Sequence, residues 1–568
     1  MFRTEHPKPQ WRRESFENLN GPWDFTFDFG GAGEKLGLQN ADAVYDKTIE
    51  VPFCPESSLS GIGYTNFIDS CWYRRTITVT EAELSGIVRL HFGAVDYKAT
   101  LFVNGKRIGT HTGGYVSFYF DIQDALTVGE NRIVLHAEDD TRSPLIPSGK
   151  QSTRYESHGC FYTRTTGIWQ TVWLERLPKV HIESAKYYPD IENGTLTVTA
   201  ELAGAGTLTA RALWEGKPMG EISLASHGGH TTFTLPLAET HLWEVGVGGL
   251  YDLTLTYGDD RVESYFGLRS ARLDGYKFLI NERSVFQRLV LDQGFYPDGI
   301  YTAPSDEALC HDIEMSMAVG FNGARLHEKI FEERFLYHAD RLGYLVWGEY
   351  PNWGADPDRH EFLYAVLPEW MAEMDRDFNH PSIIGWCPLN ESFQPGGRTG
   401  QIDEILKTIY RVTKAKDPTR PCIDTSGYIH TGKTDIFDVH DYEQNPEAFA
   451  RSFEKFESED TFQNFCNRWQ KYPGKMPMFV SEYGGTQTPT DSEGWGYGNA
   501  PKTYEEFYAR IEGLTDVLLQ NGKMFGYCYT QLTDVEQEQN GIYYYDRSPK
   551  YDTEKLRSIF GKKAKIED

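Results

Sequence analysis

Long hydrophobic runs and closely spaced cysteines are both missing from this sequence of 568 residues. No stretch approaches the roughly 18 consecutive apolar residues that a membrane-spanning helix requires, so we expect a soluble protein with no membrane partner. The eight cysteines are scattered, without a C-x-x-C pair or the spacing of zinc ligands. We therefore expect buried free thiols and no metal site built from cysteine.

Basic residues are scarce, because 56 Lys and Arg stand against 83 Asp and Glu, giving a formal net charge of −27. A negative charge of this size repels nucleic acid phosphates and anionic lipid headgroups, so no nucleic acid partner is expected. Residues 1–16 carry charges and prolines where a secretory signal has an apolar core. This favours a cytoplasmic protein, the alternative being a signal removed before residue 1.

The length and an apolar share of 39% predict several folded domains. Residues 1–178 contain short β-branched and aromatic runs broken by turns, which predicts a β-sandwich. Residues 179–268 form a second strand-rich stretch, with turns at the spacing of an immunoglobulin-like sandwich.

From residue 269 to residue 568, short apolar segments alternate with helix-period stretches, which predicts a (β/α)₈ TIM barrel. The eight candidate strands lie near Phe286, Arg325, Val346, Trp386, Ile423, Val439, Phe479 and Tyr527. The predicted fold is therefore two β-sandwiches followed by this barrel.

Two glutamates close candidate strands of the barrel, where catalytic groups of this fold lie. Glu391 ends the fourth strand and Glu482 ends the seventh, so both are expected at one mouth. A facing pair of carboxyls is typical of glycoside hydrolysis, in which one acts as acid and base while the other attacks the anomeric carbon. Asn390 is placed to hold a sugar hydroxyl. For either glutamate taken alone, an exposed acid at a strand end is an equally good interpretation.

Four segments match a known family: residues 103–122 (VNGKRIGTHTGGYVSFYFDI), 162–175 (YTRTTGIWQTVWLE), 376–392 (RDFNHPSIIGWCPLNES) and 477–485 (PMFVSEYGG). In them the chain resembles glycoside hydrolase family 2, which contains β-galactosidases, β-glucuronidases and β-mannosidases. The first two segments are similar to the family's sugar-binding jelly roll, and the last two to its acid/base and nucleophile segments. The resemblance implies a retaining exo-glycosidase with Glu391 as general acid/base and Glu482 as nucleophile.

The resemblance also points to residues around these glutamates. His440 and Tyr442 follow the sixth strand, where the family keeps a polar residue and a tyrosine near the nucleophile. Arg325 and His327 lie where the family has an Arg-Thr-Ser-His segment, here one residue shorter, so the role of His327 stays open. Arg325 is either a substrate ligand or a structural ion-pair partner.

Three further candidates come from other segments. Glu349, at the end of the third strand, either binds sugar or, as we favour, anchors the arginine of the second strand. Tyr529 stands where the family usually has a tryptophan under the sugar ring, which predicts a smaller platform. In the first domain, Asp139 and Asp140 either reach the barrel mouth or belong to a solvated turn.

The sugar is less well defined than the chemistry. Glucuronidases of this family usually carry an Asn-x-Lys motif after the eighth strand, whereas Asn540 is followed here by Gly541 and Ile542. A neutral sugar is therefore expected, and β-D-galactosides come first because they are frequent in the family. β-Glucuronides, β-glucosides, fucosides, arabinosides and galactofuranosides stay open.

Two other functional classes compete with a retaining glycosidase. A metal-dependent barrel hydrolase with Asp438, His440, Asp441 and Glu482 as ligands is disfavoured, because only His440 offers a nitrogen ligand. A non-catalytic carbohydrate-binding protein would retain the sandwiches but would not need both glutamates. No dinucleotide fingerprint or P-loop is present, so no organic cofactor is expected; a bound cation and a homo-oligomer stay open.

Overall fold

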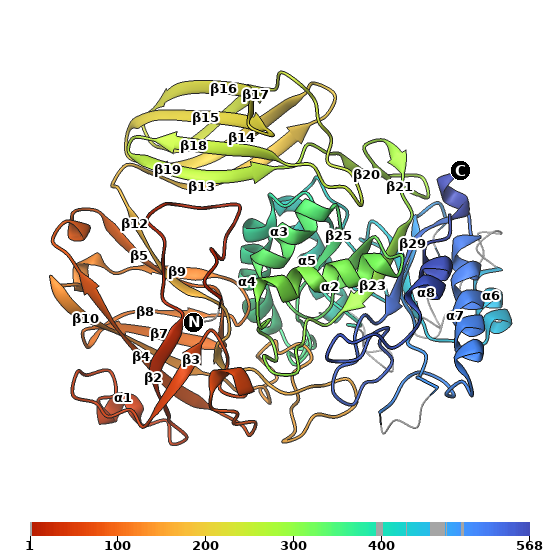
Figure 1. Cartoon of the computed structure of the whole chain (residues 1–568), viewed down its shortest axis with the longest axis horizontal. Coiled ribbons are helices and arrows are strands. Elements are labelled where there is room, and N and C mark those ends of the chain that lie inside the picture. The colour runs from red at the N-terminus through yellow and green to blue at the C-terminus, as the bar shows by residue number, and fades with distance from the viewer. Residues whose placement is uncertain (1–2, 393–400, 428, 455–471, 473, 490–493) are drawn as a thin grey trace.

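The computed structural model describes residues 3–392, 401–427, 429–454, 472, 474–489 and 494–568. The chain forms two β-sandwiches and a sheet surrounded by helices, in that order (Figure 1). The first sandwich is drawn in red and orange, the second in yellow, and the helix-surrounded sheet in green to blue. No helix among the described residues is both long and apolar enough to cross a membrane.

The first sandwich packs a four-stranded sheet on a six-stranded one. The smaller sheet has the order β1 (Glu17–Asn18), β12 (Val172–Leu177), β5 (Ile87–Phe92) and β9 (Phe118–Asp121). The larger has the order β3 (Lys47–Val51), β2 (Gly21–Phe27), β4 (Ser70–Val79), β10 (Gly129–Glu138), β7 (Lys98–Val103) and β8 (Lys106–Thr112). Alternate residues of β2, such as Trp23 and Phe25, are buried in the core between the sheets.

The second sandwich has seven antiparallel strands in two sheets, as an immunoglobulin-like domain does. One sheet contains β13 (His181–Asp190), β14 (Thr195–Ala203) and β17 (Gly229–Pro236). The other contains β16 (Lys217–Ser226), β15 (Gly206–Trp214), β18 (Tyr251–Tyr257) and β19 (Asp260–Phe266). The domain limits at residues 178 and 268 stay predictions.

The third part is built on seven parallel strands. Their order is β26 (Ile383–Cys387), β25 (Leu345–Glu349), β24 (Gly323–Leu326), β23 (Gln287–Asp292), β29 (Met524–Thr530), β28 (Met478–Gly484) and β27 (Phe437–Asp441). The helices are α2 (Asp306–Ala318), α3 (Glu333–Leu342), α4 (Phe362–Asp377), α5 (Gln401–Lys416), α6 (Pro446–Phe453), α7 (Tyr504–Leu519) and α8 (Thr553–Phe560). This arrangement confirms the predicted TIM barrel.

The predicted fifth strand, near Ile423, is the exception. Residues 421–427 touch β26 through isolated parallel bridges, with the Ile423 amide donating to the Trp386 carbonyl at 3.0 Å. Toward β27 the contact is made by a side chain, because the Gly427 amide donates to Asp438 Oδ2 at 2.9 Å. The segment therefore fills the fifth place of the ring without a regular ladder.

Candidate active site

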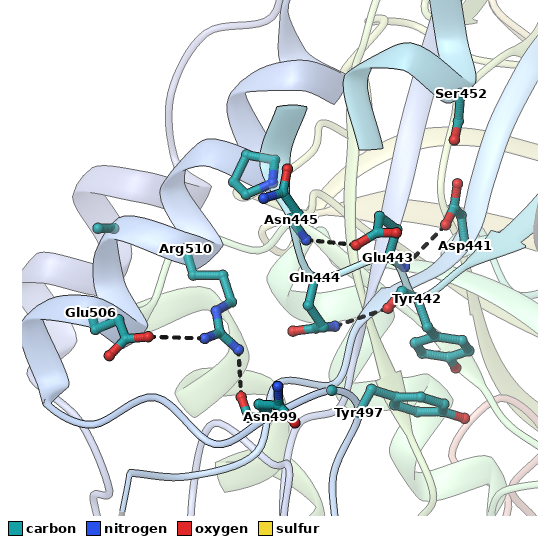
Figure 2. A pocket seen from close by; sticks show the side chains of 13 residues that line it. Asp441, Tyr442, Glu443, Gln444, Asn445, Ser452, Tyr497, Asn499, Glu506 and Arg510 are labelled. Atoms are coloured by element: carbon teal, nitrogen blue, oxygen red, sulfur yellow. Dashed lines mark hydrogen bonds and ion pairs between the residues drawn. The ribbon is translucent and has the colours of Figure 1, made fainter. Parts of the chain in front are cut away.

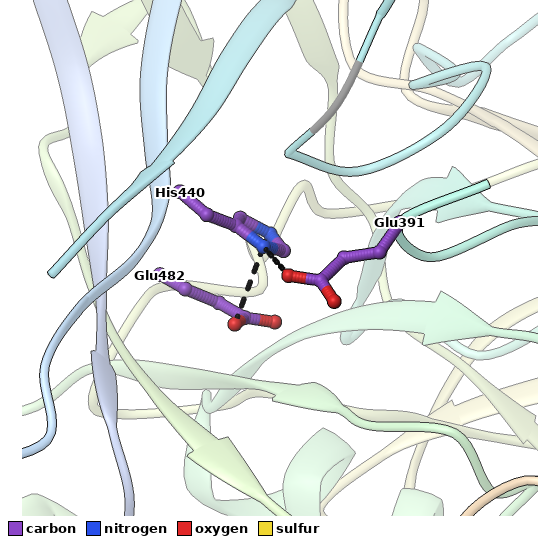
Figure 3. Close-up of side chains that lie close together, drawn as sticks. All are labelled: Glu391, His440 and Glu482. Carbon is purple, nitrogen blue, oxygen red and sulfur yellow. Dashed lines mark hydrogen bonds and ion pairs between the residues drawn. The ribbon is translucent and has the colours of Figure 1, made fainter. Parts of the chain in front are cut away.

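Both glutamates that the sequence predicts to be catalytic lie at one mouth of the barrel. Glu391 follows β26, and Glu482 lies in β28. One carboxylate oxygen of each, together with a ring nitrogen of His440, fall within 4.8 Å of one another (Figure 3). This spacing is close to the ~5–5.5 Å between the two carboxyls of retaining glycosidases, and shorter than inverting enzymes need.

Glu482 is held by a fully buried arginine. Arg325 Nη1 donates to the Ser481 carbonyl at 2.7 Å and lies 3.1 Å from Glu482 Oε1. Its Nη2 donates to Glu349 Oε2 at 2.6 Å, and Glu349 Oε1 lies 2.9 Å from His327 Nδ1. Arg325 and Glu349 therefore occupy anchoring positions behind Glu482, and His327 lies beside them despite the shorter spacing.

The surroundings of Glu482 favour its ionised form. Burial alone raises the pKa of this carboxyl, but the charges of His440, His327 and Arg325 oppose burial and bring the pKa to about 2. The Tyr442 hydroxyl also donates a hydrogen bond to Glu482 Oε2. An ionised, oriented carboxylate is the form that a nucleophile requires.

His440 lies between the two glutamates. Its Nδ1 is 2.7 Å from Glu391 Oε1 and 3.3 Å from Glu482 Oε2, and its Nε2 is 3.0 Å from Ser426 Oγ. Burial lowers the pKa of His440, but the two carboxylates outweigh burial and raise it. A proton on Nδ1 is thus within hydrogen-bond distance of the proposed acid/base.

Asn390 faces the same mouth. Its Oδ1 accepts from Arg325 Nη2 at 3.3 Å, and its backbone carbonyl accepts from Trp353 Nε1 at 3.2 Å. Among the described residues, none accepts a hydrogen bond from Asn390 Nδ2. This amide group is therefore available to a sugar hydroxyl.

The structure places Tyr529 away from the mouth. Its ring packs against Phe321, Phe560 and Tyr483, on the side of β29 that faces the helices. Side chains alternate along a strand, so the next residue, Thr530, faces inward, with its hydroxyl 3.2 Å from that of Tyr442. The predicted sugar platform at Tyr529 is therefore not supported.

Asp139 does not reach the barrel mouth either. It follows β10 inside the first sandwich, where burial, with Glu56 nearby, raises its pKa to about 8. Asp140 is exposed and accepts a hydrogen bond from the Arg142 amide at 3.1 Å. Of the two interpretations of this pair, the turn fits Asp140, while Asp139 is a buried acid of the sandwich.

Several residues at the site had no signal in the sequence. Tyr497 stacks on Tyr442 with ring centroids 3.6 Å apart. From the first sandwich, the Tyr162 hydroxyl donates to Glu538 Oε2 at 2.6 Å, and a loop carrying Lys150 packs on Trp353. Tyr497 reaches the site on a barrel loop, whereas Tyr162 and Lys150 come from loops of the first sandwich. The sequence does not show that these loops of the sandwich pack on the barrel.

A cavity of about 940 Å³ lies next to the site (Figure 2). Tyr442 and Tyr497 form part of its wall, and neither catalytic glutamate lines it. Its other lining residues are Asp441, Glu443, Gln444, Asn445, Pro446, Ser452, Gly498, Asn499, Glu506, Ala509 and Arg510. The catalytic centre is therefore assigned by the geometry of the glutamates, and this cavity lies behind the tyrosine pair.

The metal-site alternative is not supported. Among the described residues, the trio Glu391, His440 and Glu482 alone brings potential ligand atoms within 4.8 Å of one another. Asp438 instead accepts hydrogen bonds from the Ser426 hydroxyl and the Gly427 amide, both at 2.9 Å. The four ligands of this alternative are thus not brought together.

Two family models match the chain. Residues 16–178 match the sugar-binding domain of glycosyl hydrolases family 2, and residues 302–564 match the TIM barrel domain of the same family. The chain belongs to glycoside hydrolase family 2. This confirms the resemblance seen in the sequence and the expectation of a glycosidase.

Named relatives in this family differ in their sugar. A β-glucuronidase of Paenibacillus borealis is 24% identical over 98% of each chain. A β-galactosidase of Leuconostoc mesenteroides is 23% identical over 88% of this chain. The chain spans about half the length of this and another curated relative. The solved β-glucuronidase of Ruminococcus gnavus has the same fold, with a TM-score of 0.79, 19% identity and coverage of 97% of this chain and 98% of that one.

Proposed function

We propose that this protein hydrolyses terminal β-glycosides with retention of configuration. The observation that carries the proposal is the pair of Glu391 and Glu482, with carboxylate oxygens within 4.8 Å and the second held ionised by buried cations. A non-catalytic sugar-binding protein would not need that arrangement.

In the first step, Glu482 attacks the anomeric carbon while Glu391 gives its proton to the glycosidic oxygen, so the C–O bond breaks and the aglycon leaves as an alcohol. In the second step, Glu391 removes a proton from water, which attacks the anomeric carbon and releases Glu482. Arg325 and Tyr442 fix the nucleophile, and Asn390 is positioned to hold a hydroxyl of the sugar.

Two sugars are candidates. β-D-Galactosides are the prediction from the sequence, based on their frequency in the family. β-Glucuronides are favoured by a different observation: the Paenibacillus and Ruminococcus proteins, which this chain matches over 98% of their own length, both carry that name. The missing Asn-x-Lys motif stands against glucuronides unless another cation takes its place.

The decisive experiment is hydrolysis of a panel of aryl β-glycosides, comprising galactoside, glucuronide, glucoside, mannoside, fucoside and furanosides. We expect activity on at least one, with the β-anomer of the sugar as the first product by NMR, and loss of activity in Glu482→Ala. Release of the α-anomer, or an unchanged rate in the variant, would contradict the mechanism.

A further inference from the structure

We propose that Lys150, contributed by the first sandwich, is a specificity residue that binds the carboxylate of a uronic acid sugar at the barrel mouth. The inference rests on the proposed glycosidase function and gives its substrate class. The barrel motifs do not identify Lys150, because it belongs to another domain. It lies more than 150 residues before α2, the first helix of the barrel.

The loop that carries Lys150 is fixed to the barrel. The amides of Ser148 and Gly149 donate to the Trp353 carbonyl at 2.7 and 3.1 Å. Gly149 has φ +54°, and a Cβ there would come within 2.4 Å of the Glu328 carbonyl oxygen, so the close approach requires glycine. The position of Lys150 is therefore set by contacts on both sides of the domain boundary.

The following residues anchor the loop in the sandwich. Gln151 Nε2 donates to Asp96 Oδ2 at 2.7 Å, and its Oε1 accepts from the Thr165 amide at 2.8 Å. The Lys150 carbonyl accepts from the Tyr162 amide at 2.7 Å. A backbone held in this way presents its side chain in one direction, as a recognition site requires.

Lys150 is largely buried and has no counter-ion among the described residues. Only 5% of the residue is exposed, yet none of the described residues accepts a hydrogen bond from its Nζ or forms an ion pair with it. Nζ lies 4.1 Å from the centroid of the Trp353 ring, whose Nε1 donates to the Asn390 carbonyl. A largely buried cation without a counter-ion, close to the residues that follow β26, is a site for a ligand anion, because an unpaired buried charge is costly.

The charge of Lys150 is maintained by its surroundings. Burial lowers the pKa of the ammonium group, but the negative charges of Cys160, Glu538, Glu482 and Glu391 outweigh burial and raise it above its usual range. Lys150 is therefore cationic at neutral pH, and these same charges place it in the field of the catalytic centre.

Glu538 lies near Lys150 but does not form an ion pair with it. Its Oε2 accepts from the Tyr162 hydroxyl at 2.6 Å and its Oε1 accepts from Asn540 Nδ2 at 3.1 Å. Burial raises the pKa of Glu538, and the nearby charge of Lys150 opposes that rise. Asn540 is the residue after which the family's lysine is missing, so Lys150 supplies a positive charge in the same neighbourhood from another domain.

The test compares 4-nitrophenyl β-D-glucuronide with the matched β-D-glucoside, which differs only at the carboxylate. In Lys150→Met, the ratio of kcat/KM for the glucuronide to kcat/KM for the glucoside should fall about 100-fold, as expected for loss of a charged hydrogen bond. Lys150→Arg should restore most of the ratio, since it retains the charge. Lys106→Met, which removes an exposed lysine at the start of β8, should leave both rates unchanged.

A second measurement does not depend on turnover. D-Glucaro-1,5-lactone, which carries a carboxylate, should bind wild type more tightly than D-gluconolactone by calorimetry, and Lys150→Met should abolish the difference. An unchanged ratio or an unchanged lactone preference in a folded variant would overturn the inference, as would a wild type that acts on neutral glycosides alone. A wild type inactive on every glycoside would contradict the proposed function, while the lactone experiment would still test Lys150.

Discussion

Two groups of buried carboxyls in this molecule behave in opposite ways. At the barrel mouth, Glu349 and Glu482 are buried, yet both have a pKa below the usual range. Burial acts to raise each pKa, but it is outweighed by the charges of Arg325 and His327 at Glu349, and by those of His440, His327 and Arg325 at Glu482. The mouth is therefore built to keep buried acids ionised.

In the first sandwich, Glu56, Asp96 and Asp139 are buried without such cations. Burial raises the pKa of Glu56 to about 7 and that of Asp139 to about 8, and that of Asp96 lies well above its usual range. The nearby Arg164 donates to backbone carbonyls of residues 65, 152, 154 and 155 instead. The comparison shows that cation placement, more than burial, separates a reactive carboxylate from a neutral buried acid.

The largest expected effect distinguishes the two groups directly. Glu482→Gln should lower kcat/KM by about five orders of magnitude, because the attacking group is removed. Glu56→Gln keeps an acceptor for the Thr166 amide and lies outside the mouth, so its rate should stay within about threefold of wild type. The measurement is kcat/KM of both variants by steady-state kinetics. Comparable losses in the two would show that the mouth carboxyls and the sandwich carboxyls do not differ in function.

Glu391→Ala should have the next largest effect, and one that depends on the leaving group. Loss of the general acid slows glycosides with poor leaving groups by about 10²–10⁴-fold and activated dinitrophenyl glycosides much less in the first step. Azide should accelerate the variant and give a β-glycosyl azide, since it needs no general base. Equal losses for all leaving groups, with no azide product, would assign the acid to another residue.

His440→Asn tests how the mouth keeps its nucleophile ionised. In the proposed mechanism Glu482 reacts as the carboxylate, so activity is expected to fall as the pH drops through its pKa, which is about 2. His440 is the largest of the charges that oppose burial there, so its removal raises that pKa and moves the acid limb of kcat/KM to higher pH. His230→Asn, at an exposed histidine of the second sandwich, should leave the profile in place. An unmoved acid limb in His440→Asn would show that this charge is not what holds Glu482 ionised.

The smallest effect concerns the sandwich acids. A carboxyl whose pKa is raised on folding, such as Asp139, makes the folded state less stable as the pH rises from about 4 to about 8. Asp139→Asn should therefore raise Tm by about 2 °C or more at pH 9 and leave it unchanged near pH 4. The exposed Asp140→Asn serves as the control, and a pH-independent change in Asp139→Asn would contradict the interpretation.

The fold and the position of Glu391 and Glu482 at one mouth could be predicted from the sequence because their signals are local. Glu391 and Glu482 each lie in a strand-end motif, and parallel strands deliver such ends to one mouth. Tyr529 was misplaced by a single residue, since alternation along β29 turns it outward and Thr530 inward. Lys150 could not be found in this way, because its place depends on how one domain packs on another.

The amides of residues 148 and 149 donate to the Trp353 carbonyl and hold a loop of the first sandwich against the barrel. The proposed site is therefore made from two separate stretches of the chain. In the proposed function, the strand ends of the barrel cleave the glycosidic bond, and the loop that carries Lys150 binds the part of the sugar that varies between substrates. Substitutions in that loop leave the barrel strands untouched. Such a division lets a lineage acquire a new substrate while its chemistry stays constant, and it gives the protein engineer a small, addressable stretch to redesign.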